Sequence, residues 1–550
     1  MLANYVHDFP FDSFALGLIL VALPYLAILR GVSGLQSPPW VRWYRRLVAG
    51  AAIALALTAS ARYLAAALPE VDGLDFYFYL CFARDALHGV VEPSPAKYAY
   101  FPGGYRFWEF AMRLVGENLQ ALQFVFICLL AANAALCAMI AARCVKSAVA
   151  GVMAGLWYLA LASRFEGLDG TTEPIATLFA LLGLLAWGGE PLRGSPGLRR
   201  ALLLGAGLGM AAWIKQQGGL VALGVAALAF NYMMDRPAVR DRLSQLFVIP
   251  ACAACVFVLA MLMEGQGLMP LQTGLHHVVE YEPLGSMIKN LVRLATQSGP
   301  AVWFFLLALY FWIALLLSGG VLGRRQAPWA AVVGYCLVAA IATFIQFSKR
   351  SSPHYGLLAA PYISIAIAVT GMRAMQSASA IWPRLRPFFE IAAVGALSLP
   401  MIGSMGKVGH FQVWPPVWNP IVEAQRHWHE FDDVAPDIEA LATVISPGDS
   451  VLVLPPRRNV IHYLVGSVSL ANPHRYGWGG DWDVSRSIRT PGLDAVVVLH
   501  PRSLEQGDST LCAVASCYRA IAELPDAGFD KAVVLPSMTV WRSSSLRQGP

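Results

Sequence analysis

Residues 120–142 read QALQFVFICLLAANAALCAMIAA, a run without a charged side chain. At about 1.5 Å of rise per residue, a helix of this length covers roughly the 30 Å hydrocarbon core of a bilayer. Apolar runs of similar length recur from residue 15 to about residue 403. The sequence therefore predicts a polytopic α-helical membrane protein.

The composition agrees with this class. Hydrophobic residues make up 57% of the 550 residues and charged residues only 13%, whereas soluble domains carry about 25% charged residues. The net charge of +6 does not indicate a nucleic-acid partner, because most of the excess Arg lies in short connections, where it orients a membrane protein. The expected environment is a lipid bilayer.

About twelve membrane spans are expected from the apolar runs. Residues 1–12 contain neither Lys nor Arg and carry Asp8 and Asp12. This is the reverse of a basic signal-peptide start, so the first run is expected to stay in the membrane. The expected spans begin near residues 14, 47, 120, 147, 173, 200, 218, 245, 300, 328, 354 and 388.

The connections between these spans predict the orientation. With the N-terminus outside, every inner connection is basic, as the positive-inside rule requires. The inner cations are Arg30, Arg42, Arg45 and Arg46; Arg143 and Lys146; Arg193, Arg199 and Arg200; Arg236, Arg240 and Arg242; Arg324 and Arg325; and Arg373, Arg384 and Arg386. Twelve spans place the C-terminal region outside. Cys512 and Cys517 lie there, close in sequence, and suit a disulfide in such a compartment.

The chain is expected to divide into three parts. Residues 1–46 form an extra N-terminal transmembrane helix and a basic inner loop. Residues 47–409 form the transmembrane core, with interfacial helices in the first outer loop at 69–118. Residues 410–550 form a small soluble α/β domain, expected on the periplasmic side.

The first outer loop, VDGLDFYFYLCFARDALHG from Val71, is the richest in chemistry. Apolar stripes with helical spacing follow Phe76 and Phe107, and they predict two amphipathic helices in the membrane interface. Asp75 lies just after the second span and just before the first stripe. A general base and an N-cap for the helix from Phe76 are both compatible with that position.

A second acidic segment, SRFEGLDGTTEP, lies between two expected spans and offers Asp169 and Glu173. Thr171 or Thr172 would cap the next helix, and Pro174 suits its first turn. Capping and solvation are the simpler interpretation, and catalysis is the alternative.

Cations at the outer ends of spans break the positive-inside trend. An unpaired Lys at that depth either reaches the headgroups or meets an anion, and an Arg there indicates a bound phosphate. The candidate phosphate- and substrate-binding residues are Lys215, Gln216, Lys349, Arg350, His354 and Tyr355.

The segment HHVVEYE is the candidate metal-binding segment. On a helix, His276 and Glu280 would share one face and form a pair that divalent cations bind, although an ordinary polar loop is the alternative. No cofactor is assigned from the sequence, and a bound divalent cation is the alternative.

From about His410 the composition becomes that of a soluble domain. The runs 451–455, 494–500, 531–536 and 538–542 are typical of strands, and 461–466 and 513–524 of helices. The sequence contains no GxGxxG, P-loop or nucleophile elbow, so no catalysis is assigned to this domain.

Residues 72–115 resemble the GT-C membrane glycosyltransferases. The resemblance rests on an Asp at the membrane mouth, D-F-x-x-Y at 75–79, A-L-x-G at 86–89, and an aromatic-Pro-Gly stretch at 101–103. The pattern is most similar to polyprenyl-phosphate-mannose-dependent mannosyltransferases, and more distantly to protein mannosyltransferases and the lipid A aminoarabinose transferase. WIKQQGG at 213–219, KRSSPHYGLLAAP at 349–361 and the segment 451–479 are similar to later family positions.

The resemblance implies an inverting sugar transfer on the outer face of a bacterial inner membrane. The donor would be a polyprenyl-phosphate-linked sugar, and the acceptor a hydroxyl of a glycan, lipid or protein. Asp75 would be the general base, Tyr79 would contact substrate, and the outer cations would stabilise the leaving phosphate.

Two features depart from the family pattern. The family usually begins with its N-terminus inside, so residues 1–30 look like an added span before an eleven-span core. The first loop also lacks the paired Asp-Glu or the Glu-x-x-Tyr of several branches, which leaves Asp75 as the single match. A polytopic transporter and a lipid-carrier polymerase or ligase of cell-envelope polysaccharide are the alternative functions; a transporter would show inverted repeats and mid-membrane charges.

Overall fold

The chain was analysed as a computed structural model, which describes part of its length. The described residues are 71, 74–89, 102–165, 167, 170–188, 194–233, 239–264, 328–349, 353–381, 430–454, 488–489, 492–499 and 521–544, with short pieces at 288–289, 292, 305–310, 312–313, 407–408, 411–412, 461 and 463. The expected spans near residues 14, 47 and 388 lie outside them.

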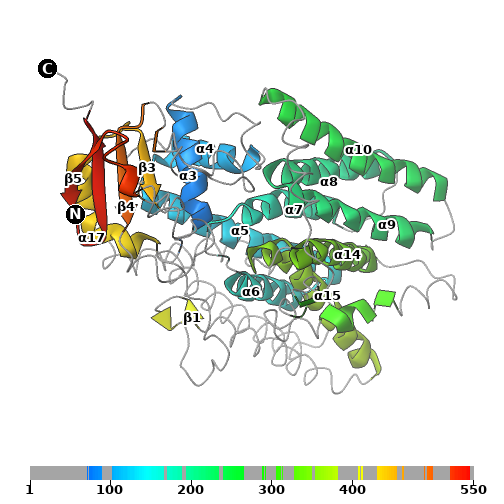
Figure 1. Ribbon diagram of the computed structural model, residues 1–550. Helices are drawn as coiled ribbons and strands as arrows, with labels where there is room; N and C mark the ends of the chain where they lie inside the picture. Colours follow the sequence, from blue (N-terminus) through cyan, green and yellow to red (C-terminus); the bar gives the residue numbers. More distant parts are fainter. Residues whose placement is uncertain are drawn as a thin grey trace. The chain divides into compact units, whose positions relative to one another are not determined.

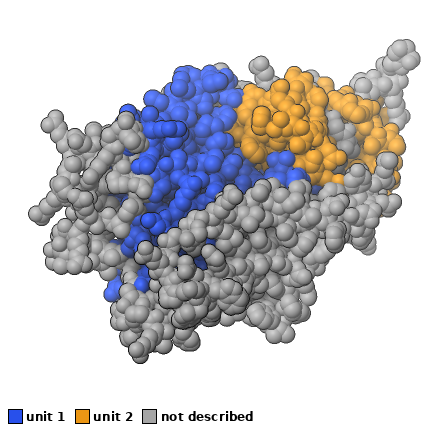
Figure 2. Space-filling view, turned by 180° about the vertical axis from the view of Figure 1, so that it is seen from behind, with its two compact units in different colours: residues 1–70, 123–265, 279–426 blue, residues 71–122, 266–278, 427–550 orange. Residues whose placement is uncertain are grey.

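The chain divides into two compact units (Figure 2). The first unit comprises residues 1–70, 123–265 and 279–426, and the second comprises residues 71–122, 266–278 and 427–550. The second unit therefore groups the first outer loop with the C-terminal region, two segments that are far apart in the sequence.

The first unit is helical (Figure 1). Helices begin close to the expected starts at 120, 147, 173, 200, 218, 245, 328 and 354, while the span expected near 300 is described only in short pieces. The elements are α5 (Leu119–Val145, whose first turn belongs to the second unit), α6 (Ala148–Arg164), α7 (Glu173–Trp187), α8 (Gly194–Ile214), η3 (Gln216–Leu223), α9 (Gly224–Met233), α10 (Val239–Met263), α14 (Pro328–Lys349), η4 (Pro353–Leu358) and α15 (Ala360–Ile381).

The surface of α10 is apolar. Among the described residues, Leu119–Val145 and Leu246–Met263 form helices that by length and composition could cross a membrane. Phe247, Leu259 and Met263 on α10 are each more than half exposed. Large contiguous apolar surface is uncommon on soluble proteins, so this face is suited to lipid.

Glycine lets α8 pack closely against both α7 and α10 (Figure 1). A Cβ at Gly207 would lie 2.5 Å from the carbonyl oxygen of Phe179 in α7, and a Cβ at Gly205 would lie 2.5 Å from that of Ile249 in α10. Small residues at such crossings are typical of helix packing in membranes. This packing sets the position of the first turn of α7.

The second unit contains the two helices expected in the first outer loop, α3 (Leu74–Leu87) and α4 (Gly103–Val115). On α3, every residue from 76 to 85 except Phe82 is buried. On α4, Phe110 and Leu114 are exposed and Trp108 is buried. An interfacial helix requires an apolar face open to the surroundings, and α4 has such a face, whereas the interfacial position of α3 stays a prediction.

The second unit also contains a four-stranded sheet in the order β3-β4-β6-β5 (Figure 1). The strands are β3 (Val451–Leu454), β4 (Ala495–Leu499), β5 (Phe529–Val534) and β6 (Met538–Ser543), all within one residue or two of the expected runs. β3 and β4 are parallel, and the other pairs are antiparallel. A short antiparallel pair, β1 (Lys407–Val408) and β2 (Phe411–Gln412), belongs to the first unit.

Helix α17 (Glu430–Val444) packs on this sheet and was not expected from the sequence. Its Asp437 accepts hydrogen bonds from the backbone N–H of Ser537, at 2.6 Å, and from the Ser537 hydroxyl. Arg542 on β6 donates to the carbonyl of Val444 and pairs with Asp449 at 2.9 Å. These contacts fix the helix to the sheet through charge-assisted hydrogen bonds.

Candidate functional site

Lys215 lies at a break in the helical chain of the first unit. α8 ends at Ile214, Lys215 is extended with φ −143° and ψ 127°, and the 3₁₀ helix η3 starts at Gln216. Short 3₁₀ segments between helices commonly mark functional positions. The following Gly218 packs so closely that a Cβ there would lie 2.4 Å from the carbonyl oxygen of Ala211. The break therefore holds the Lys215 backbone in a fixed place.

Lys215 is paired with Glu173, the first residue of α7. The Lys215 Nζ lies 2.5 Å from Oε1 of Glu173. Glu173 is fully buried and Lys215 nearly so. Buried charges require a partner, and here each side chain is the counter-ion of the other. The anion that Lys215 was expected to meet is thus, in this structure, a protein carboxylate.

His354 and Tyr355 join this pair from η4. His354 Nε2 lies 4.0 Å from Oε1 of Glu173. The Lys215 Nζ lies 5.4 Å from the centroid of the Tyr355 ring, a cation–π distance, and the His354 and Tyr355 rings are 4.5 Å apart. Lys215 and His354 therefore approach Glu173, and Tyr355 packs beside both of them; all four residues were candidates from the sequence. We refer to these four residues as the Glu173 cluster.

Asn133 supports the helix turn that carries Glu173. It is fully buried in α5, and its Nδ2 donates to the carbonyl of Pro174 at 2.8 Å and to the Tyr158 hydroxyl at 3.2 Å. A hydrogen bond to a carbonyl in the first turn of α7 limits how that turn can move. Asn133 was not among the predicted site residues, although an asparagine in the middle of the apolar run 120–142 was a visible signal.

The start of α7 is unusual in its hydrogen bonding. Thr172 occupies the N-cap position, but its side chain makes no capping hydrogen bond, contrary to the expected role. In the described part of the chain, the hydroxyls of Thr171 and Thr172, the Oε2 of Glu173 and the Oε1 of Gln217 are buried and lack a hydrogen-bond partner. Each such group costs about 1–3 kcal/mol. Buried polar atoms of this kind are typical of a binding site.

The remaining candidates of the first outer loop belong to the second unit. α3 begins at Leu74, so Asp75 lies inside its first turn and not at the cap position. Asp75 is half-buried, and Tyr79 is almost fully buried. Asp75 is thus partly exposed, whereas Tyr79 is enclosed in the interior of its unit.

The other candidates lie at or beyond the edge of the described residues. Lys349 is the last residue of α14, and its side chain is not described. Arg350, Asp169, His276, Glu280, Cys512 and Cys517 lie outside the described residues. Within the described ranges, no three His, Cys, Asp or Glu side chains gather as a metal site.

With this geometry in view, comparison with solved structures shows the fold of the chain. The chain shares the GT-C fold of its solved neighbours. It is similar to ArnT, the lipid A aminoarabinose transferase, from Cupriavidus metallidurans. Against the structure bound to undecaprenyl phosphate, the TM-score is 0.57 at 15% identity, with 94% of this chain and 100% of that chain covered.

The apo state of the same ArnT gives a TM-score of 0.56 at 15% identity, with 93% and 99% covered. An oligosaccharyltransferase from Archaeoglobus fulgidus in complex with Zn and sulfate gives a TM-score of 0.46 at 13% identity, with 88% of this chain and 73% of that chain covered. No protein-family model and no curated protein matches the chain in sequence.

Proposed function

We propose that this protein is an integral-membrane glycosyltransferase that moves a sugar from a polyprenyl-phosphate carrier to an acceptor hydroxyl. The observation that carries the proposal is the Glu173 cluster: a buried ion pair, a histidine and a tyrosine in a GT-C fold. An ArnT structure of the same fold is bound to undecaprenyl phosphate, which supports a lipid carrier of this kind.

The cluster has the chemistry to hold the carrier phosphate. The leaving group is a lipid phosphate, and cations must stabilise its developing negative charge. Lys215 alone cannot supply that charge, because Glu173 already balances it at 2.5 Å. The extra positive charge in this proposal comes from His354 and from Lys349 and Arg350, which precede it by five and four residues. Gln216 and Tyr355 contribute polar contacts.

Glu173 is then a positioning residue. Its carboxylate is fully buried and engaged with Lys215, so an acceptor hydroxyl cannot approach it in this state. Its role is to keep Lys215 ionised and aimed, and Asn133 fixes the turn that carries it. A carboxylate that orients a cation acts on catalysis through that cation.

Asp75 is the general base in this proposal. It is partly exposed and stands in the first turn of α3. In the transfer, the acceptor oxygen attacks the anomeric carbon and the bond to the phosphate oxygen breaks with inversion. The acceptor proton passes to Asp75, and the carrier leaves as polyprenyl phosphate. General-base catalysis of this type contributes roughly 10²–10⁴-fold.

The proposed location is the bacterial inner membrane, with the C-terminal sheet and the site on the periplasmic side. The basic inner connections support this orientation. The sugar and the nature of the acceptor, whether glycan, lipid or protein, are the open parts of the proposal.

The test uses the full-length protein in sealed proteoliposomes with radiolabelled polyprenyl-phosphate sugar and a membrane extract as acceptor. Label should move from the carrier to a second product, and Lys215→Met should abolish the movement. Lys531→Met, an exposed lysine on β5, is the matched control and should retain it. Label that crosses the membrane on an unaltered molecule would indicate a transporter instead. Growth of a carrier-linked polymer would indicate a polymerase.

A further inference from the structure

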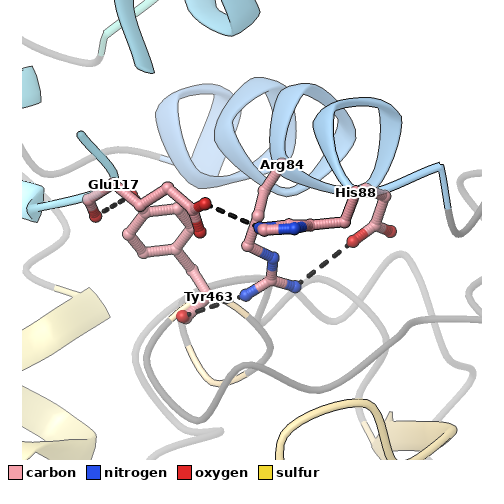
Figure 3. Close-up of polar contacts among 5 residues, drawn as sticks. Arg84, His88, Glu117 and Tyr463 are labelled. Atoms are coloured by element: carbon pink, nitrogen blue, oxygen red, sulfur yellow. Dashed lines mark hydrogen bonds and ion pairs between the residues drawn. The ribbon is translucent and has the colours of Figure 1, made fainter. Parts of the chain in front are cut away.

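Tyr463 joins two separate parts of the first outer loop (Figure 3). Its backbone carbonyl accepts a hydrogen bond from NH1 of Arg84 on α3 at 3.1 Å, across 379 residues of sequence. Its hydroxyl donates to the backbone carbonyl of Glu117, in the turn between α4 and α5, at 2.6 Å. One residue of the C-terminal segment thus holds the loop at two points, and all three residues belong to the second unit.

The ring of Tyr463 packs on one face of α3. The Arg84 guanidinium carbon lies 5.7 Å from its centroid, and the Tyr77 ring lies 6.3 Å away. Tyr77, Cys81 and Arg84 follow one another at spacings of four and three residues, so they share a face of the helix. Tyr463 itself is 8% exposed. The contact is therefore an enclosed one.

The protonation states of Tyr463 and Arg84 favour the hydrogen bonds at this contact. Burial raises the pKa of the Tyr463 phenol above its ordinary value, so the hydroxyl remains a donor at neutral pH. Burial opposes the charge of Arg84, but its neighbours Cys81 and Asp85 raise its pKa above the ordinary value. Asp85 also accepts a hydrogen bond from Arg84 NH2 at 3.3 Å (Figure 3). Removing one partner from such a buried network leaves the others unsatisfied.

We propose that Tyr463 is a positioning residue through which the C-terminal domain holds α3, and with it Asp75, in place. This inference rests on the proposed role of Asp75 as the general base. It gives the C-terminal domain a task in the reaction although that domain carries no catalytic motif. Asp75 lies two residues before Tyr77 in the same helix, so a shift or rotation of α3 moves its carboxylate directly.

The inference predicts a particular kinetic signature. Loss of the Tyr463 contact misplaces the base and leaves the cations of the first unit unaltered. A misplacement of about 1 Å can cost on the order of 10²-fold in rate. The turnover number kcat should therefore fall, while the KM for the lipid donor stays at the wild-type value.

Cys81 provides a readout that does not depend on activity. It is a free cysteine, 5% exposed, on the α3 face that Tyr463 covers. In Tyr463→Ala, Cys81 should react with a maleimide about tenfold faster or more, because local opening governs access to a buried group. Tyr463→Phe keeps the ring and the backbone carbonyl but loses the hydroxyl, so it should lie between wild type and Tyr463→Ala. Peptide mass spectrometry assigns the labelling to Cys81.

The controls separate local loosening from unfolding. Cys336 is fully buried in the first unit and should stay unlabelled in every variant. If the maleimide also labels Cys336 in Tyr463→Ala, that variant has unfolded. The labelling of Cys81 in Arg84→Lys then tests the inference, because Arg84→Lys changes α3 without altering the C-terminal domain. Val534→Ala, an exposed position on β5, should match wild type throughout.

Wild-type Cys81 labelling and wild-type kcat in Tyr463→Ala would overturn the inference. Faster Cys81 labelling with unaltered kcat would overturn the positioning role of Tyr463, but it would still support the contact between Tyr463 and α3. If the wild-type protein transfers no sugar, the proposed function fails, and the Cys81 labelling still reports whether Tyr463 holds α3.

Discussion

Lys215 Nζ lies 2.5 Å from Oε1 of Glu173, which joins the break after α8 to the first residue of α7. Both side chains are buried, so the pair is electrically neutral where it stands. A site that must receive a phosphate at this point therefore needs further positive charge, and the nearest described titratable group is His354.

Breaking the pair should destabilise the protein strongly. Lys215→Met leaves the Glu173 carboxylate buried and unpaired, an effect of about 3–5 kcal/mol. The double variant Glu173→Met/Lys215→Met removes both charges and should recover most of that loss while remaining inactive. Thermal unfolding followed by tryptophan fluorescence measures the stabilities, with Lys531→Met as control. Equal melting temperatures for wild type and Lys215→Met would show that the pair contributes nothing.

Asp75→Asn should fold normally and lose sugar transfer. Asn lacks the negative charge that favours Asp in the first turn of a helix, so the variant should lose only about 0.3–1 kcal/mol of stability. Asn cannot accept the acceptor proton, so the variant has no general base at this position. Transfer should fall by about 10²–10⁴-fold with the melting temperature nearly unaltered. The matched control is Asp526→Asn, in an exposed turn before β5. Near-normal turnover in Asp75→Asn would make Asp75 structural, and Asp169 or Glu173 would become the leading base candidates.

His354→Ala and Arg350→Ala should raise the KM for the lipid donor and lower kcat. The reason is the charge deficit at the Glu173 cluster: each of these residues supplies part of the unbalanced positive charge that stabilises the leaving phosphate. Arg350→Lys keeps the charge but loses the bidentate geometry, and it should be intermediate. Steady-state kinetics with varied donor measures both parameters. If Arg350→Ala changes neither, Arg350 does not contact the donor.

Glu109 on α4 should give a pH-dependent contribution to stability. Burial opposes its charge, but hydrogen bonds from Arg106 at 2.5 Å and Arg113 at 2.7 Å lower its pKa below the ordinary 4.5. A carboxylate with a lowered folded pKa stabilises the fold above the unfolded pKa, and the contribution is lost as pH falls through the folded pKa. The difference in melting temperature between wild type and Glu109→Gln should thus shrink as pH falls below 4.5. A difference independent of pH would assign the effect to packing.

The C-terminal region should be outside the cytoplasm, with Cys512 and Cys517 bonded. A reporter fused after residue 550 should be active only in its periplasmic form. Non-reduced protein should leave both thiols unalkylated, and reduction should release them. A fusion active in the cytoplasm would contradict the orientation, whereas free thiols in a periplasmic domain would contradict the disulfide alone.

Much of the fold could be predicted from the sequence. Apolar runs placed helices α5 to α10, α14 and α15, and period-two or continuous β-branched runs placed all four strands of the C-terminal sheet. These signals are local, so they can be read from a short window. Helix α17 was missed because its single apolar face is interrupted by Asp433 and Pro436 near its start.

The candidate site could be predicted only in part. Lys215, His354 and Tyr355 were visible as polar residues at span ends, but their convergence on Glu173 depends on helix packing that no local pattern encodes. For Glu173, capping and solvation were the simpler interpretation and catalysis the alternative, because its burial and its partner Lys215 depend on tertiary packing. The burial of α3 was missed because its apolar stripe predicts one covered face, and tertiary contacts cover the remaining faces as well.

The strand order of the C-terminal sheet has a consequence for biosynthesis. β6 lies between β4 and β5, yet it is the last of the four strands to be synthesised. Until β6 has been synthesised, β4 and β5 each present an unpaired edge, which is a template for wrong pairing. Arg542, which binds Val444 and Asp449, also arrives only then. The four-stranded sheet can therefore close only after β6 has been made, and the edges of β4 and β5 stay open to wrong pairing until then.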